Sequence, residues 1–219
     1  MTNNHELVTY LQNKNACYPA MEWLKDRDLF RMWEECERGD WLLWFAAKVG
    51  IDRKVIVRTA CACAREALCF VSDGRPKTAI ETAERWCNGE ATIEQARNAA
   101  DAAYATYAAV AADADAAVAA DAAYATYAAY AASAASAASA ADADASAASA
   151  VSAAYAVASA SSAARAVAAA AADAAAAADA RKEALAKSAQ IVRSMMSLDQ
   201  IKDALASPGS PSGRVQGSD

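Results

Sequence analysis

The sequence predicts an all-α protein, in which a compact N-terminal bundle of short helices is followed by a long alanine-rich helical hairpin. Alanine is the default residue from about 91 to 195, where neither glycine nor proline occurs. Because alanine has the highest helix propensity, this stretch is expected to be helical. The bulky apolar residues needed for a core lie before it, including all five tryptophans: Trp23, Trp33, Trp41, Trp44 and Trp86.

The first part of the N-terminal bundle, residues 1–90, is predicted to consist of short helices in quick succession. Residues 4–13 form the first expected helix, with Asn4 as its N-cap, and residues 16–25 form the second. Asp28 is placed to cap a third helix, because its carboxylate can accept a hydrogen bond from a free backbone N–H of the first turn.

The middle of the bundle holds the most apolar segment of the chain. Residues 41–47 are apolar nearly all round, which is typical of a helix at the centre of a core. Asp40 is expected to cap this helix. A turn at Gly50 then leads to an N-cap at Asp52 and to a helix that is predicted to run to about Val71.

The alanine-rich stretch, residues 91–196, is expected to fold back on itself and to dock on the bundle. One continuous helix would be about 160 Å long at about 1.5 Å per residue, too long for an unsupported monomer. Asp and Ser, which compete for backbone hydrogen bonds, concentrate at residues 141–146, so the turn is expected there. A short helix at 197–206 and a disordered tail at 207–219 are expected to follow.

The repeats within this stretch do not share one face of a helix. The 20-residue offset between Tyr104 and Tyr124 corresponds to a rotation of about 200°. An ice-binding helix needs regularly spaced threonines on one side, and Thr106 and Thr126 are separated by the same rotation. The repeats therefore indicate duplication under weak packing constraint.

The net charge of −6 comes from the alanine-rich stretch. Seven aspartates and one arginine lie between residues 99 and 178, and the rest of the chain has 20 basic and 20 acidic residues. An acidic arm disfavours nucleic acid as a partner, because phosphate backbones require clustered Lys and Arg. Asp and Ser also interrupt the alanine run too often for a transmembrane helix, so no membrane partner is expected.

No cofactor, metal site or catalytic group is expected. Cys61 and Cys63 would point about 200° apart on a helix, and His5 is the only histidine. The glycines are scattered singly, so no phosphate-binding loop is present. With no secretory signal, the six cysteines are expected to be free thiols in a reducing cytoplasm, and the chain is expected not to be an enzyme.

Two polar groupings in the bundle supply the candidate binding residues. In the simplest interpretation, Asp40 caps a helix and the second grouping is a set of salt bridges bracing the loop before Pro76. The alternative is a binding surface anchored by tryptophan and arginine, the residue types that most often dominate protein interfaces. The candidates are Asp40, Trp41, Trp44, Arg65, Glu66, Asp73, Arg75 and Trp86.

Short motifs spread over residues 15 to 195 carry a family resemblance. They include Arg38-Gly39-Asp40-Trp41-Leu42-Leu43-Trp44, Ala60-Cys61-Ala62-Cys63-Ala64-Arg65-Glu66 and Asp73-Gly74-Arg75-Pro76. In these motifs the chain resembles alanine-rich proteins of bacteria and phages that are assigned as immunity proteins of polymorphic-toxin systems. It departs from their pattern at Gln190, where a cysteine is expected, and in its Gly/Pro/Ser-rich tail.

The resemblance implies an all-helical, non-enzymatic protein that binds and neutralises a cognate toxin, and it implies no catalytic residue. The first functional hypothesis is therefore a cytoplasmic protein-binding module of the immunity type. The alternative is a structural or self-assembly protein, or a counter-defence accessory protein of phage or bacteria, that uses the alanine-rich arm to form a homo-oligomer.

Overall fold

The computed structural model describes residues 4–66, 68, 74–96, 98–99, 101–102 and 174–206. Over these residues the ordered elements are helices and no strand occurs, which confirms the predicted all-α class. The predicted hairpin turn at 141–146, the predicted tail at 207–219 and the candidate binding residue Asp73 lie outside the described residues.

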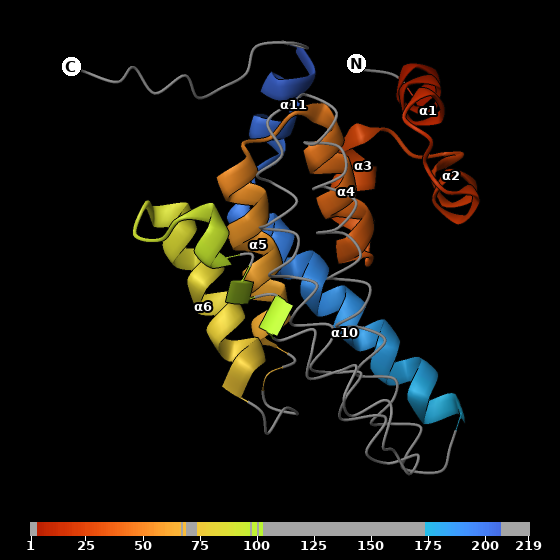
Figure 1. Ribbon diagram of the computed structural model, residues 1–219. Helices are drawn as coiled ribbons and strands as arrows, with labels where there is room; N and C mark the ends of the chain where they lie inside the picture. The colour runs from red at the N-terminus through yellow and green to blue at the C-terminus, as the bar shows by residue number, and fades with distance from the viewer. Residues whose placement is uncertain are drawn as a thin grey trace, which may run out of the picture.

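The helices follow one another with short connections in the N-terminal part (Figure 1). In chain order they are α1 (Asn4–Asn13), α2 (Tyr18–Leu24), α3 (Leu29–Glu35), α4 (Gly39–Val49), α5 (Arg53–Arg65), α6 (Gly74–Asn88), α10 (Ala174–Met195) and α11 (Leu198–Ala206). A further helix begins at residue 93, after a capping box in which Thr92 Oγ1 accepts from the backbone N–H of Gln95 at 3.1 Å.

Two of the predicted helix starts are confirmed by their hydrogen bonds. Asp28 Oδ1 accepts from the backbone N–H of Arg31 at 2.9 Å, and Asp52 Oδ1 accepts from that of Lys54 at 2.9 Å. Each carboxylate thereby satisfies a donor that the first helical turn leaves free. Gly50 ends α4 in the left-handed conformation, with φ 97°, which glycine adopts without steric cost.

The range predicted for the first helix, 4–13, is that of α1, and the side-chain amide of Asn4 donates to the carbonyl oxygen of Leu24 at the end of α2. Two other boundary predictions are wrong. Asp40 is not the cap of α4, because α4 begins at Gly39 with Arg38 in the N-cap position. α5 ends at Arg65 and not near Val71, and the next backbone N–H bonds three residues back instead of four, as at a tightened helix end.

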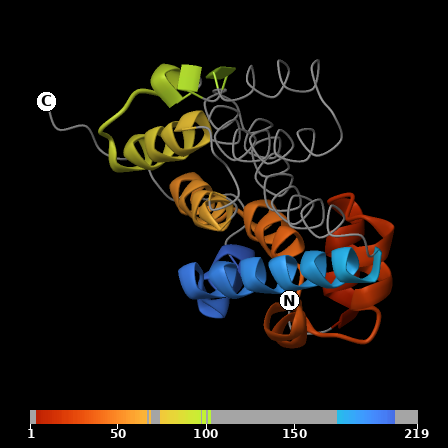
Figure 2. The same cartoon turned by 90° about the horizontal axis from the view of Figure 1, so that it is seen from below.

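The main core forms where α10 lies across α4 and α5. Figures 1 and 2 show α5 between α6 and α10, with α10 running alongside both α4 and α5. Trp33 is only 1% exposed, and Val192 from α10 is fully buried in the same cluster. The other large side chains buried in this cluster include Leu7, Leu24, Leu42, Leu43, Met196 and Ile201.

A smaller core joins α5 to α6. Its buried members are Val57, Cys61, Ala64, Ile80, Ala83 and Cys87. These residues are mostly small, so the two helices pack closely, and Arg58 adds hydrogen bonds of 3.0 Å to the carbonyl of Cys87 and to the side chain of Asn88. None of the helices within the described residues is both long and apolar enough to cross a membrane.

Gly39 sets how closely α4 and α10 approach. A Cβ atom at this position would lie 2.6 Å from the Ser188 backbone carbonyl carbon and 2.7 Å from the Ala189 nitrogen, well inside van der Waals contact. These are backbone atoms, which cannot rotate away as a side chain can. The glycine of the Arg38-Gly39-Asp40-Trp41 motif is therefore required by packing.

The substitution Gly39→Ala is predicted to destabilise the protein by about 1–3 kcal/mol, because the added methyl group forces α10 away from α4. Urea unfolding followed by tryptophan fluorescence measures the loss. Gly74→Ala is the matched control: an added Cβ there meets nothing within 4 Å, so its stability should equal or exceed that of the parent protein. Equal stabilities for the two variants would contradict the packing argument.

Candidate functional site

A surface hollow of about 410 Å³ is bounded by α2, by the connection from α3 to α4, and by α10. Its volume lies in the range of pockets that accept a small ligand or a protruding side chain. The lining combines aromatic, charged and apolar side chains: Trp23, Glu35, Cys36, Glu37, Arg38, Trp41, Lys182 and Leu185.

Two indole rings form the aromatic part of the hollow. Trp23 from α2 and Trp41 from α4 meet edge to face, with ring centroids 6.2 Å apart and an interplanar angle of 61°. This geometry places the positive edge of one ring against the negative face of the other. Both rings are half-buried and pack against the main core, so they hold their positions while remaining accessible from the hollow.

Arg38 is fixed at the edge of the hollow by two neighbours. Its guanidinium carbon lies 4.4 Å from the ring centroid of Trp41, a cation–π arrangement. Its Nε donates to Asp40 Oδ1 at 2.8 Å and its Nη2 donates to Oδ2 at 2.5 Å. This bond to Asp40 raises the pKa of Arg38, so the side chain remains charged.

Asp40 therefore has a different structural role from the predicted cap. Its side chain is 9% exposed, and its two oxygens bind the fork of one guanidinium. A nearly buried carboxylate needs such a partner, because leaving it unpaired would carry the full cost of desolvation. Arg38 and Asp40 thus act as one rigid unit at the first turn of α4.

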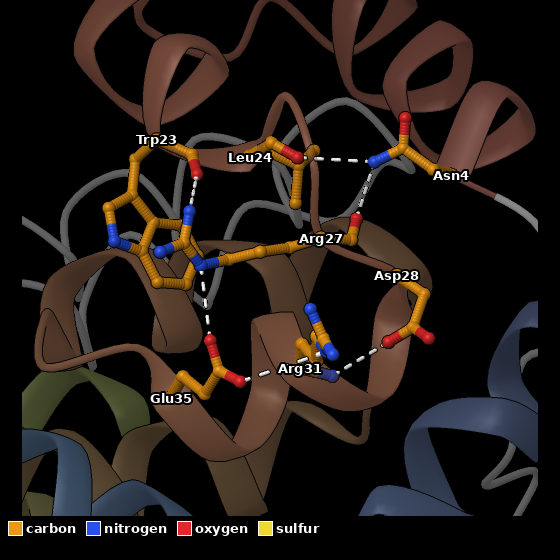
Figure 3. A network of polar contacts seen from close by, with 7 residues as sticks. All are labelled: Asn4, Trp23, Leu24, Arg27, Asp28, Arg31 and Glu35. Atoms are coloured by element: carbon orange, nitrogen blue, oxygen red, sulfur yellow. Dashed lines mark hydrogen bonds and ion pairs between the residues drawn. The ribbon is translucent and has the colours of Figure 1, made fainter.

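A second arginine, Arg27, lies between α2 and α3 beside two residues of the hollow, and Figure 3 shows its polar contacts. Arg27 stacks on Trp23 with its guanidinium carbon 4.3 Å from the ring centroid, and it also donates to the Trp23 carbonyl oxygen. Its Nε donates to Glu35 at 3.2 Å. Asn4 of α1 stabilises the connection between α2 and α3, since its side-chain amide donates to the carbonyl oxygens of Leu24 at 3.1 Å and Arg27 at 2.5 Å.

The floor of the hollow is tied to α10 through Arg193. Its Nη1 donates to the carbonyl oxygens of Trp33 at 3.2 Å and Cys36 at 2.9 Å, which satisfies carbonyls left free at the end of α3. Cys36 lies beneath, and burial raises the pKa of its thiol to about 11. A thiol that stays protonated is a poor nucleophile, so Cys36 acts as a core residue.

The structure brings together only part of the predicted set of candidates. Trp41 lines the hollow and Asp40 binds the lining residue Arg38, whereas Trp44 packs on the main core with Lys48 over its ring at 5.7 Å. Trp86 packs against the smaller core. Within the described residues, neither of these two tryptophans lines the hollow.

The Arg65–Glu66 grouping lies at the end of α5 and forms ion pairs with other helices. Arg65 binds Glu84 of α6 with N–O distances of 2.8 and 2.5 Å, and Glu66 pairs with Lys187 of α10. Arg75 is exposed in the first turn of α6. These pairs join α5 to its two neighbours, so their observed role is to connect helices.

Several residues of the hollow were not predicted from sequence. They are Trp23, Glu35, Cys36, Glu37, Arg38, Lys182 and Leu185. The sequence did contain a signal for Arg38, because this residue lies two positions before Asp40, and Asp40 directly precedes Trp41. Lys182 and Leu185 had none, since their place beside Trp23 depends on how α10 returns to the bundle.

A second hollow of about 510 Å³ lies between α1 and α2. It exposes Tyr18, whose surface is 75% accessible, and its rim carries the ion pair between Glu22 and Lys25 at 2.6 Å. It lacks the stacked Arg and Trp pairs of the first hollow, so the first is the stronger candidate site.

The described residues contain no group of three or more His, Cys, Asp or Glu side chains arranged to hold a metal ion. The lining of the hollow consists of two indoles, a fixed guanidinium, further charged side chains of both signs, and the side chains of Cys36 and Leu185. No family model matches the chain, and no curated protein or solved structure is significantly similar to it.

The substitution Arg38→Ala is predicted to lower the free energy of unfolding by about 1–3 kcal/mol, because it leaves the nearly buried Asp40 carboxylate without its partner. Chemical denaturation measures the change. Glu22→Gln removes an exposed ion pair with Lys25 and should leave stability unchanged. A loss no larger for Arg38→Ala than for Glu22→Gln would show that the Arg38–Asp40 pair does not stabilise α4.

Alkylation of the native protein at pH 8 should modify the exposed Cys17 and spare the buried Cys36, Cys63 and Cys87. Burial raises the pKa of Cys36 and Cys87 to about 11 and that of Cys63 to about 12, so little thiolate forms. Peptide mass mapping identifies the modified residues. Labelling of Cys36 at the same rate as Cys17 would contradict the burial of the Cys36 side chain.

The same raised thiol pKa values predict how stability depends on pH. The folded state holds these protons more tightly than the unfolded chain, whose thiols titrate near pH 8.5. The contribution of these buried thiols to the stability of the fold is therefore fully present below that pH. It is lost as the pH rises toward their pKa values in the folded protein, about 11 for Cys36 and about 12 for Cys63. Replacing the buried Cys63 with Ala should reduce the slope of this decline.

Proposed function

We propose that this chain is a non-enzymatic protein-binding module, and that the hollow bounded by Trp23, Trp41 and Arg38 is its contact site. The single observation that carries the proposal is the presence of two fixed arginine–tryptophan stacks side by side at an open hollow, Arg38 on Trp41 and Arg27 on Trp23. Tryptophan and arginine are the residues most often found to dominate binding energy at protein interfaces.

The rigidity of these side chains supports a binding role. Arg38 is held by Asp40 and Trp41, and Arg27 by Glu35 and Trp23, so little side-chain entropy remains to be lost on binding. Charged residues of both signs surround the hollow, as in the polar rim of a protein interface.

The family resemblance of the Arg38-Gly39-Asp40-Trp41 segment supports a more specific proposal, in which the partner is a protein toxin that the chain neutralises by direct binding. In this proposal the chain is an immunity protein that acts in the cytoplasm, and the hollow receives a side chain of the toxin. The alternative, a self-assembly protein using the alanine-rich arm, concerns residues that lie mostly outside the described ones.

Co-expression tests the proposal directly. Each toxin encoded beside the gene is expressed with or without this chain, and growth and co-purification are measured. One of these toxins is expected to be tolerated only when the chain is present and to co-purify with it. Failure of every neighbouring toxin to bind or to be neutralised would contradict the immunity proposal.

The variant Glu37→Lys locates the contact once a toxin is found. Glu37 is 63% exposed at the hollow, so reversing its charge should leave the fold intact but weaken binding at least about tenfold through like-charge repulsion or a lost contact. Asp199→Lys on α11 reverses an exposed charge that does not line the hollow. Equal affinities for the two variants would place the contact elsewhere.

A further inference from the structure

The walls of the hollow come from parts of the chain that are far apart in sequence. Trp23 belongs to α2 and Trp41 to α4, whereas Lys182 and Leu185 belong to α10. Leu185 is buried against the core and Lys182 is 73% exposed at the rim. Without α10, this side of the hollow would have no wall.

Arg193 connects the docking of α10 to the shape of the same hollow. Its two hydrogen bonds to the carbonyl oxygens of Trp33 and Cys36 hold the end of α3, and the residues that follow, up to Arg38, line the hollow. A charged donor to half-buried carbonyls is among the stronger hydrogen bonds in a protein. Arg193 thus links α10 by hydrogen bonds to the segment that leads into Glu37 and Arg38.

An ion pair spans the mouth of the hollow. Lys182 Nζ on α10 lies 3.9 Å from Glu37 Oε2 on the α3–α4 connection, and both side chains are largely exposed. A pair this long and this exposed contributes little to stability, so both charges can bind a partner at small cost. The complementary partner is a protein segment with an apolar side chain facing Leu185 and the indoles, flanked by one acidic and one basic residue.

We infer that the hollow is a composite binding surface that exists only while α10 is docked, with Arg193 as the positioning residue, and that partner recognition is thereby coupled to the docking of α10. The coupling to recognition rests on the proposed function. A partner that binds only the form with α10 docked stabilises that form. Conversely, any change that releases α10 lowers the affinity for the partner.

Alkylation of full-length variants tests the docking without any partner. In Arg193→Met, the native-state labelling rate of Cys36 is expected to rise at least about tenfold, while Cys87 stays protected. Arg58→Met is the matched control, because Arg58 donates to the carbonyl of Cys87 at the far end of α6. It should expose Cys87 and leave Cys36 protected. Unchanged labelling of Cys36, or equal acceleration of both thiols in Arg193→Met, would overturn the inference.

Exchanging the charges of Lys182 and Glu37 tests the recognition of the partner. The probe is the toxin that co-purifies with the chain. Lys182→Glu should weaken binding at least about tenfold, and Lys182→Glu combined with Glu37→Lys should remain equally weak, because it restores the internal pair but presents the wrong charges to the partner. Recovery of binding in the double variant would overturn the recognition part. If no toxin binds, the proposed function fails, and the labelling of Cys36 still decides whether α10 builds the hollow.

Discussion

The close contact between Gly39 and α10 is the constraint on which the rest of the structure depends. The backbones of α4 and α10 meet at Ser188 and Ala189, where there is no room for even a methyl group. This approach lets Val192 and Met196 from the far end of the chain enter the same core as Trp33. Because α10 is the C-terminal part of the alanine-rich stretch, this contact joins that end of the stretch to the N-terminal helices.

Electrostatics gives the candidate site its fixed shape. The opening turn of α4 places a nearly buried carboxylate, Asp40, under Arg38, and Arg38 in turn covers Trp41. Arg27 and Trp23 repeat the arrangement on the neighbouring helix. In both cases a guanidinium is bound at its edge by a carboxylate and on its face by an indole, which leaves it little freedom. The short motif around Gly39 therefore both allows the close approach of α10 and fixes Arg38 and Trp41 at the hollow.

Sequence reasoning found the elements better than it found their contacts. The all-α class and the caps at Asp28 and Asp52 followed from local rules, because propensity and capping depend on nearby residues. Asp40 was misassigned because a carboxylate before an apolar run fits both a cap and a buried ion pair, and only the position of Arg38 separates them. The α10 wall of the hollow was not predictable, since Lys182 is about 140 residues away from Arg38 in sequence.

The central claim is that α10 docks on α4 and α5 of its own chain. Zero-length carboxyl–amine cross-linking tests it most directly, because the Glu66 and Lys187 side chains form an ion pair between α5 and α10. Mass spectrometry of the monomer band is expected to show a Glu66–Lys187 cross-link, with the local Glu22–Lys25 pair as the internal standard. A Glu66–Lys187 cross-link confined to covalent dimers, or its absence from monomers that carry the Glu22–Lys25 link, would contradict the account.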